Sequence, residues 1–443
     1  MSTKLLLLFS AAGLWAMSPP TMAAQQVVSS QKVMDTGSEQ LWKVLFSGLV
    51  DVRFARTGAE RNWMEQGPSS TNPIGGRGLT RYGGFDLDND GLGDRKGNLL
   101  KLPQAYFVTD ITYASDVAAH LQLNYDDADM GSTGVGNFGL AEGYVAWNLP
   151  LSTFYALRTR AGLLFPPVSM ENGGVGWSTQ QTLTPSAINT WIGEEVRPAA
   201  VELSMLRKSR DDSLTLSIAA ISGSDTSGNL LAYRGWAMHD LQARKGTRLR
   251  IQQHVTGSAA RTTDPMVEAD GKLGYYGQFG FTLGDWLDLR YFRFDNLGDE
   301  TTRSNLMDGA WRTKFNVTSL RLTPFNGFNA TSQYLWGSTV MRPPPGTIDD
   351  AIYAWYGMLS YQWDSETLAA RYDIFSIQDR DFPADYEGQA GHALTFAFTH
   401  QFSAAHRITA EWLKMESRRE GNSGFGAGDP DDDLIQVNYR FVY

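Results

Sequence analysis

The sequence predicts an all-β fold, a closed antiparallel transmembrane β-barrel of about 16 strands with long extracellular loops. Three observations support this fold class. The chain begins like an exported protein, it ends in a strictly alternating strand, and short and long connections alternate between its strand-like segments. The 443 residues include no cysteine. A barrel closed by its own hydrogen bonds needs no disulfide, so this composition agrees with the predicted fold.

Residues 1–24 have the pattern of a secretory signal peptide. Lys4 supplies a positive charge, an apolar run follows from Leu5 to Met17, and Met22-Ala23-Ala24 offers the small residues that a signal peptidase requires. The alternative is a transmembrane anchor, but the run is shorter than the roughly 20 residues that a spanning helix needs. We therefore expect cleavage after Ala24, a short periplasmic segment over 25–44, and the barrel over 45–443.

Bulk composition narrows the class of protein. A mature chain of about 420 residues would ordinarily suggest two or three soluble domains, yet no linker or low-complexity tract divides it. The mean hydropathy of -0.30 resembles that of a soluble protein, but barrel strands hide apolar residues by alternating them with polar ones. The net charge of -10 argues against nucleic acid as a partner.

The last strand gives the sharpest signal. Between Leu434 and Tyr443, every second residue from Ile435 onward is apolar, whereas the residues between them are mostly polar. Such a strand has water on one side only. An aromatic residue at the end of such a strand resembles the terminal recognition strand of outer-membrane proteins. That resemblance implies the outer-membrane barrel assembly machinery as a partner.

The same alternation recurs along the whole chain. The strand-like segments lie near Val52, Ile111, Leu123, Val145, Arg158, Leu203, Leu216, Phe279, Leu289, Phe315, Tyr334, Trp355, Tyr372, Phe396 and Ile408. The pattern leaves open which face Arg293 and Arg321 occupy. Residues 247–255 also have strand propensity, but a further strand would make the number odd, so we assign them to a loop.

The connections alternate in length. Short ones lie near 115–116, 149–152, 208–211, 284–285, 323–326, 364–365 and 403–405. Long ones span about 57–103, 126–137, 165–197, 222–272, 296–312, 339–351, 377–389 and 417–432. Short periplasmic turns and long external loops are typical of outer-membrane barrels. A soluble sandwich or propeller would instead show repeats.

A barrel of this size encloses an aqueous channel, so we expect the polar strand faces to contact water. Arg or Lys facing lipid would cost about 2–4 kcal/mol at the membrane midplane. The predicted pore-lining residues are Asp51, Arg53, Asp110, Glu142, Arg158, Arg160, Glu202, Asp288, Arg290, Arg371, Asp373, Arg407, Glu411 and Arg440, with His120 beside them.

Positive and negative residues on this predicted wall are balanced, so the wall alone indicates no strong ion preference. Arg158 and Arg160 form the best local patch for attracting anions. In the alternative, the two arginines pair with Glu142 or Glu202 on neighbouring strands.

The third long loop is apolar in places. Ile188, Trp191 and Ile192 must be buried, either by folding of the loop into the lumen or by packing on neighbouring loops. If the loop folds inward, five polar residues become candidates for a constriction. They are Glu171, Asn172, Asn189, Glu194 and Glu195.

The first long loop contains a candidate calcium site. Asp86, Asp88 and Asp90 alternate and are followed by a glycine, as in calcium-binding loops. The twelfth position is Gly97, where such loops place a bidentate Glu, and Asp94 would have to replace it. An acidic solvated turn is the alternative. We expect no other cofactor.

The fourth long loop offers His239 and Asp240, which a hydrolase could combine with Ser222, Ser224 or Ser227. These serines lie in an ordinary Gly/Ser stretch without a nucleophile motif. We therefore expect no enzymatic activity.

Several segments resemble outer-membrane porins. They are 157–166 (LRTRAGLLFP), 184–195 (TPSAINTWIGEE), 391–398 (GHALTFAF) and 410–413 (AEWL). Within that group the chain is similar to the porin-like family related to the phosphate-selective porins O and P. The resemblance implies a passive diffusion channel for small hydrophilic or charged solutes, often trimeric, in the outer membrane of a Gram-negative bacterium. No phosphate-binding ladder of lysine and arginine is matched, so phosphate specificity is not carried over. A non-conducting surface barrel, whose loops bind ions or a partner, is the alternative.

Overall fold

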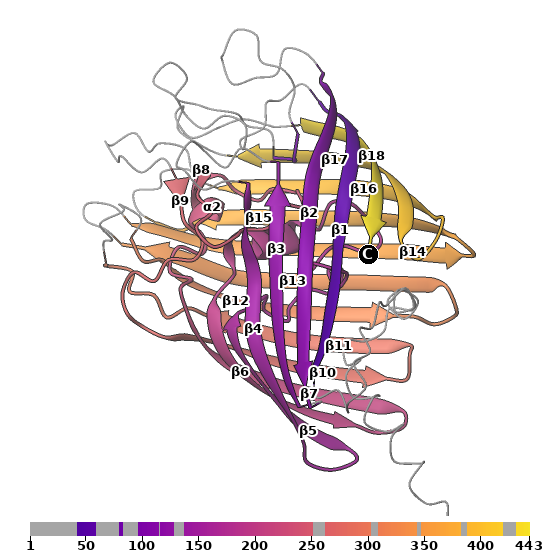
Figure 1. Cartoon of the computed structure of the whole chain (residues 1–443). Helices are drawn as coiled ribbons and strands as arrows, with labels where there is room; N and C mark the ends of the chain where they lie inside the picture. The colour runs from indigo at the N-terminus through magenta and orange to yellow at the C-terminus, as the bar shows by residue number, and fades with distance from the viewer. Residues whose placement is uncertain are drawn as a thin grey trace, which may run out of the picture.

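The computed structural model describes residues 42–58, 79–82, 96–114, 116–127, 137–250, 262–302, 309–342, 347–381, 388–419 and 431–443. Within these ranges the chain forms one closed barrel (Figure 1). Its strands are β1 (Trp42–Arg56), β2 (Asn98–Tyr113), β3 (Val117–Asp126), β4 (Phe138–Pro150), β5 (Tyr155–Leu163), β6 (Ala199–Lys208), β7 (Asp212–Ser222), β10 (Gly274–Leu283), β11 (Leu287–Asp295), β12 (Arg312–Leu322), β13 (Phe328–Met341), β14 (Ile348–Trp363), β15 (Glu366–Asp379), β16 (Gln389–Gln401), β17 (His406–Arg419) and β18 (Asp431–Val442).

These 16 strands confirm the predicted fold class. Every neighbouring pair is antiparallel, and β1 closes the ring against β18 in the register Val52↔Tyr439. The extra segment near 250 forms β8 (Leu249–Arg250), which pairs only with β9 (Thr262–Thr263). It therefore lies in a loop, as predicted. No helix in the described ranges is long and apolar enough to cross a membrane.

The two faces of the barrel wall differ sharply in polarity. On β18, Ile435 and Val437 are about 40% exposed on the outside, whereas Gln436 and Arg440 are almost fully buried on the inside. The same outward row of large apolar residues continues around the ring, and only lipid can cover it. The protein is therefore an outer-membrane barrel. The structure also places Arg293 outside and Arg321 inside.

Several strands are longer than expected. β13 to β17 have 13–16 residues, more than the roughly 9–11 that cross a bilayer. The predicted loops at 339–351 and 377–389 are therefore too long, because ladder pairs such as Met341↔Ile348 and Asp350↔Asp379 continue the sheet. The barrel also begins at Trp42 rather than at 45.

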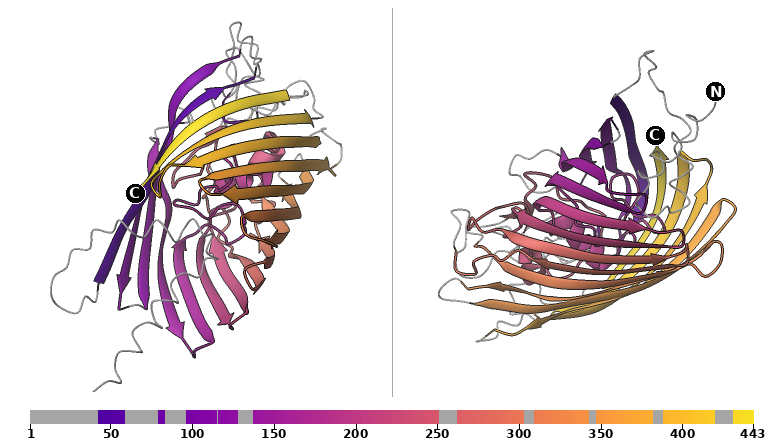
Figure 2. Two further views of the ribbon diagram at one scale, coloured as in Figure 1. Left: turned by 90° about the vertical axis from the view of Figure 1, so that its right-hand side faces the viewer. Right: turned by 90° about the horizontal axis from the view of Figure 1, so that it is seen from below.

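Two loops fill the middle of the barrel. The third loop (164–198) contains α1 (Ala187–Glu195), and the fourth loop (223–273) contains α2 (Asn229–Tyr233). Both helices lie within the ring of strands (Figures 1 and 2). The third loop thus folds inward. We call the third loop and residues 226–249 of the fourth loop the plug.

Candidate functional site

The third loop crosses the lumen and binds the opposite wall. Gln333 on β13 donates to the carbonyl of Val168 at 2.8 Å and accepts from the backbone N–H of Met170 at 3.1 Å. Glu411 on β17 accepts from the N–H of Leu183 at 2.6 Å. Buried backbone groups need such partners. The wall therefore fixes the path of the loop.

A buried ion cluster fixes the start of α1. Arg371 on β15 donates to Glu171 at 3.1 Å and to Asp373 at 2.8 Å. Asp373 in turn accepts from the backbone N–H of Ala187 at 3.2 Å, where the positive end of the helix dipole favours a carboxylate. The structure brings together one predicted constriction residue and two predicted wall residues, but it buries all three.

All nine residues of α1 are buried. Ser186 caps its first turn, and Asn189 donates to Glu171 at 2.7 Å. Trp191 packs edge-on against Trp236 of the fourth loop and Phe315 of β12, at centroid distances of 5.8 and 5.0 Å. Further apolar side chains of the inner wall complete this core. They include Phe292, Phe294, Val317, Leu335, Ile352, Met358, Phe375 and Met415.

The fourth loop covers α1 and reaches both sides of the barrel. The backbone N–H of Trp236 donates to Gln389 on β16 at 2.7 Å. The N–H of Lys245 donates to the carbonyl of Leu140 on β4 at 2.7 Å. This part of the lumen is therefore a dry core rather than a flooded passage.

Glu194 links the two loops by charge. Arg234 donates to both of its oxygens at 2.6 and 2.9 Å, and His239 Nε2 lies 2.7 Å from Oε1. Burial alone would raise the pKa of Glu194, but the charges of Arg234 and His239 lower it to about 2. His239 therefore contacts a structural carboxylate. Ser227 Oγ donates to the carbonyl of Glu195 at 3.1 Å, so it supports the loop rather than a hydrolase site.

Glu195 links the loops by hydrogen bonds. Its carboxylate accepts from Trp191 Nε1 at 2.7 Å and from the backbone N–H groups of Gly228 and Leu230 at 3.0 and 2.9 Å. Burial raises the pKa of Glu195 to about 7, although these hydrogen bonds oppose the shift. Glu194 and Glu195 hold the plug together and do not face an open pore.

A second ion cluster ties the fourth loop to the wall and to the first loop. Asp240 accepts from Arg53 of β1 at 2.8 Å and from Arg81 of the first loop at 2.7 Å. Arg81 also contacts Asp126 at 2.7 Å and Asp127 at 2.8 Å. Burial opposes ionisation, but the two arginines hold the pKa of Asp240 well below its usual range. We call these residues the Asp240 cluster.

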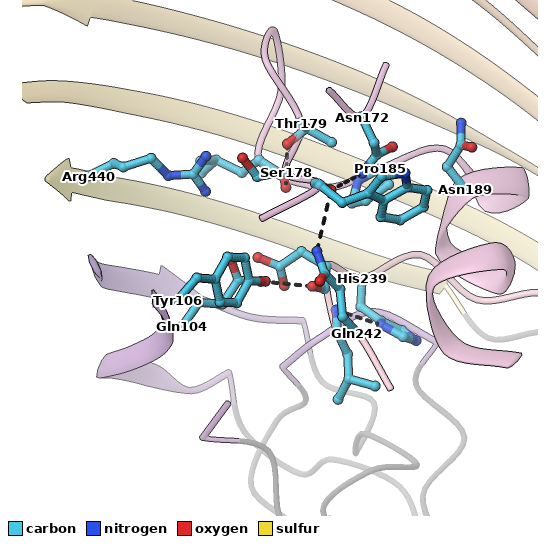
Figure 3. Close-up of a pocket in the computed structure, with 14 residues that line it drawn as sticks. Gln104, Tyr106, Asn172, Ser178, Thr179, Pro185, Asn189, His239, Gln242 and Arg440 are labelled. Atoms are coloured by element: carbon cyan, nitrogen blue, oxygen red, sulfur yellow. Dashed lines mark hydrogen bonds between the residues drawn. The ribbon is translucent and has the colours of Figure 1, made fainter. Parts of the chain in front are cut away.

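Between the loops and β2 there remains a cavity of about 10 Å³. Tyr106, Trp177 and His239 are among its lining residues, with Arg440 at one side (Figure 3). This volume is about one probe sphere, enough for a single water molecule. A hydrated solute cannot cross the plug through it.

All the predicted wall residues lie on the inner face, but the expectation that they contact water is wrong for many of them. The inward loops cover them, and they form ion pairs or hydrogen bonds in the plug or across the wall. The buried members are Asp51, Arg53, Glu202, Asp288, Arg371, Asp373, Glu411 and Arg440. Arg160 pairs with Glu202 at 2.8 Å, which is the alternative foreseen for it.

Most of the remaining wall residues lie toward the periplasmic ends of their strands, whereas Glu142 lies higher on β4 and accepts from the N–H of Phe165 at 3.1 Å. They are partly exposed, and we call this part of the inner wall the vestibule. Its residues are Asp110, His120, Glu142, Arg158, Arg160, Arg290, Arg321 and Arg407.

The third loop forms the roof of the vestibule. Arg407 donates to the carbonyl of Thr179 at 3.3 Å, and Arg321 donates to that of Met170. Asn172, at the underside of the loop, is partly exposed and donates to the carbonyl of Trp177 at 2.9 Å. Arg407 and Arg321 thus both contact the third loop through its backbone carbonyls.

The vestibule contains arginines without acidic partners. His120 pairs with Asp110, and Arg290 with Asp288, each at 2.7 Å. In contrast, Arg158, Arg321 and Arg407 form no ion pair with any carboxylate in the described ranges, and Nε of both Arg158 and Arg321 has no hydrogen-bond partner there. These three side chains are the strongest anion-attracting feature of the site.

The described ranges contain one group of clustered carboxylates, those of Asp225, Glu268 and Asp270 in the fourth loop, within 4.8 Å of one another. Asp225 accepts from the N–H of Ala269 at 2.6 Å, and Glu268 from Ser222 at 2.5 Å, so the loop itself binds them. The predicted calcium ligands Asp86, Asp88, Asp90 and Asp94 lie outside the described residues.

Sequence reasoning missed the apolar inner wall and the Asp240 cluster. A signal for the wall exists: residues 291–294 read Tyr-Phe-Arg-Phe, with rings on both faces of the strand. An apolar run without alternation is typical of a strand covered on both sides. The Asp240 cluster has no local signal, because Arg53, Arg81, Asp126 and Asp240 come from distant segments.

No protein-family model and no curated protein matches the sequence. Solved structures with similar folds include the outer membrane channel DcaP of Acinetobacter baumannii, with a TM-score of 0.56 at 9% identity over 93% of this chain and 100% of that chain. An anion-selective porin from Comamonas acidovorans has a TM-score of 0.51 at 10% identity, over 91% of this chain and 100% of that chain. OmpT, an outer membrane protein of Vibrio cholerae, has a TM-score of 0.50 at 10% identity, over 93% of this chain and 100% of that chain. At these identities the likeness concerns the fold, and the chain has the fold of a 16-stranded outer-membrane porin.

Proposed function

We propose that the protein is a porin-type channel of the outer membrane that favours small hydrophilic anions and is closed by its plug in the state described. The barrel size supports a transmembrane passage, because about 16 strands leave a lumen wide enough for water and solutes. The plug consists of loops, which connect strands without belonging to the barrel ladder. It can therefore move without breaking the wall.

The observation that carries this proposal is that Arg158, Arg321 and Arg407 form no ion pair with a carboxylate among the residues that the structure describes. A partly buried guanidinium without a carboxylate is costly, and a purely structural barrel would gain by pairing or replacing it. Around the vestibule, such cations attract anions and repel cations. The nearby carboxylates have other partners: Asp288 pairs with Arg290 and Glu202 with Arg160. Asp110 and Glu142 lie 2.7 and 3.6 Å from His120.

Reversal potentials in planar bilayers under a KCl gradient test the sign of selectivity. We expect chloride to be favoured, and we expect the double variant Arg158→Gln with Arg407→Gln to reduce the permeability ratio several-fold. Arg207→Gln is the matched control, because Arg207 also lies at a periplasmic strand end but pairs with Asp212 at 2.9 Å. Cation preference in the wild type would contradict the proposed selectivity.

The dry core of the plug favours a second candidate, a surface barrel that does not conduct. Replacing Asp240 by Asn separates the two, because it leaves Arg53 and Arg81 without their shared carboxylate. Breaking a buried pair costs about 3–5 kcal/mol, so the fourth loop should loosen and the conductance of inserted barrels should rise. Asp299→Asn, at an exposed pair with Lys272, should leave conductance unchanged. If neither the wild type nor the Asp240 variant conducts, the second candidate is favoured.

A further inference from the structure

The outer wall of β11 and β12 carries cations that face away from the lumen. Arg293, Arg312 and Lys314 alternate with the buried inward residues Phe292 and Phe315. Their carboxylate neighbour is Asp295, which lies 3.7 Å from both Arg293 and Arg312. Lys314 has no ion pair within the described part of the chain. The patch formed by Arg293, Arg312 and Lys314, which we call the outer basic patch, therefore keeps an excess of positive charge.

The outer basic patch lies toward the extracellular ends of β11 and β12, with Arg312 near the edge of an apolar band of about 25 Å and Arg293 within that band. With a rise of about 3.3 Å per residue and a tilt near 40°, Arg293 lies roughly 15 Å and Arg312 roughly 25 Å above the periplasmic ends of their strands. Aromatic rings adjoin the patch: Trp336 is 5.3 Å from Tyr334 and 6.5 Å from Tyr291, between ring centroids. Such rings mark the membrane–water interface.

The side chains are arranged to direct charge toward the head groups. Asn316, only 8% exposed, accepts from Arg293 Nη1 at 3.1 Å and from the Tyr291 hydroxyl at 2.8 Å. These bonds hold the guanidinium on the side of Asp295, at the extracellular end of β11. Long cationic side chains near an interface extend their charge out of the hydrocarbon. The charge of the patch therefore reaches the level where lipid phosphates lie.

The nearby strands β6 and β7, separated from β11 by β10 in the ring, have a different outer surface. On β6 and β7 the outward residues Val201, Ile218 and Ala220 are exposed and apolar toward the extracellular ends of the strands. Three cations gathered on one lipid-facing sector are therefore not a general property of this wall. Facing acyl chains they would be costly, whereas phosphate oxygens offer guanidinium groups strong charge-assisted hydrogen bonds.

We propose that the outer basic patch binds the phosphate groups of a phosphorylated glycolipid in the outer leaflet of the membrane. Arg293 and Arg312 would donate paired N–H groups to phosphate oxygens, and Lys314 would add a point charge. The rings of Tyr334 and Trp336 would contact the first part of the acyl chains. This site is separate from the lumen and does not depend on whether the barrel conducts.

Lipid titration of the purified full-length barrel tests this site. The probes are bis-phosphorylated lipid A and its dephosphorylated form, and binding is followed by native mass spectrometry. We expect the wild type to bind the phosphorylated form at least tenfold more tightly. The double variant Arg293→Gln with Lys314→Gln should lose that preference, and Lys314→Gln alone should lose part of it without disturbing Asn316. The control is Arg342→Gln with Arg380→Gln, rim arginines that already pair with Glu300 and Asp349; it should retain the wild-type preference.

Three outcomes would overturn the proposal. The two lipid forms could bind the wild type equally, the double variant could keep full affinity, or the control could lose as much as the double variant. A double variant that changes self-association but not lipid binding would assign the patch to a contact between copies of this chain. Heat-modifiable migration on a gel verifies that each variant forms the folded barrel.

Discussion

Glu195 is a buried carboxylate with three hydrogen-bond donors and no cationic partner in the described ranges. Burial raises its pKa from 4.5 to about 7. The folded protein thus retains a proton that the unfolded chain releases between these values, and stability falls as pH rises through this range. From pH 6.0 to 7.5 the expected loss is about 1 kcal/mol.

Thermal unfolding of the barrel in vesicles measures this loss. Glu195→Gln cannot titrate at this position, so its unfolding temperature should fall much less than that of the wild type between pH 6.0 and 7.5, whatever its absolute value. Asp225, whose pKa burial raises to about 6, acts in the same direction but mainly at lower pH. Glu416→Gln, on the exposed outer rim, should keep the wild-type dependence of the unfolding temperature on pH. If the unfolding temperature of Glu195→Gln depended on pH as strongly as that of the wild type, another group would be responsible for the pH dependence.

The residue scale also shows the limit of sequence reasoning for the site. Inner-face positions such as Asp51 and Arg440 follow from alternation alone, and they meet across the seam at 2.7 Å. Whether they contact water does not follow, because the lumen content depends on the path of loops more than 100 residues away. Arg158 illustrates this: its face was predictable, but its lack of an acidic partner was not.

At the scale of elements, α1 is the rigid centre of the plug. Its N-terminus is fixed by Ser186 and Asp373, and its C-terminal Glu195 binds the N–H groups at the start of α2. Trp191 fills the space between Trp236 and Phe315. Because every residue of α1 is buried, the helix has no face left to line an open pore.

Replacing Trp191 by Ala should therefore destabilise the plug. Large-to-small changes of this type in a packed core cost about 3–5 kcal/mol. We expect lower resistance to denaturant and faster proteolysis within the fourth loop, measured on barrels inserted in vesicles. Trp286→Ala, at an exposed turn position, is the control and should have a smaller effect. Equal effects of the two changes would contradict the central packing role of α1.

The strands were predictable from sequence where one face meets lipid and the other meets polar groups. They were less predictable on β11 to β15, where rings and aliphatic side chains occupy both faces. There the inward residues pack on the plug, as Phe292 and Phe375 do. The loops between β13 and β14 and between β15 and β16 were predicted too long for a related reason, since residues beyond the membrane no longer need alternation to continue a ladder.

At the scale of the whole molecule, two halves of the lumen differ in character. The part that holds the plug is packed like the interior of a soluble protein. The periplasmic part, the vestibule, has three arginines with no carboxylate partner within the described part of the chain. The porin fold alone does not dictate this division. It arises because the third and fourth loops carry enough apolar surface, on Ile188, Trp191 and Trp236, to complete a core with the wall.

The contacts of the first and third loops with the late strands β17 and β18 have a consequence for the order of assembly. The backbone N–H of Leu183 donates to Glu411, and that of Thr80 donates to Asp432. These partners are 228 and 352 residues apart in the sequence, and they must be neighbours when the barrel closes. Interactions this distant in sequence slow folding. A closed barrel leaves little room for two folded loops to enter the lumen through its opening. We therefore expect the early strands and their loops to associate first, and the late strands to add to the barrel around them.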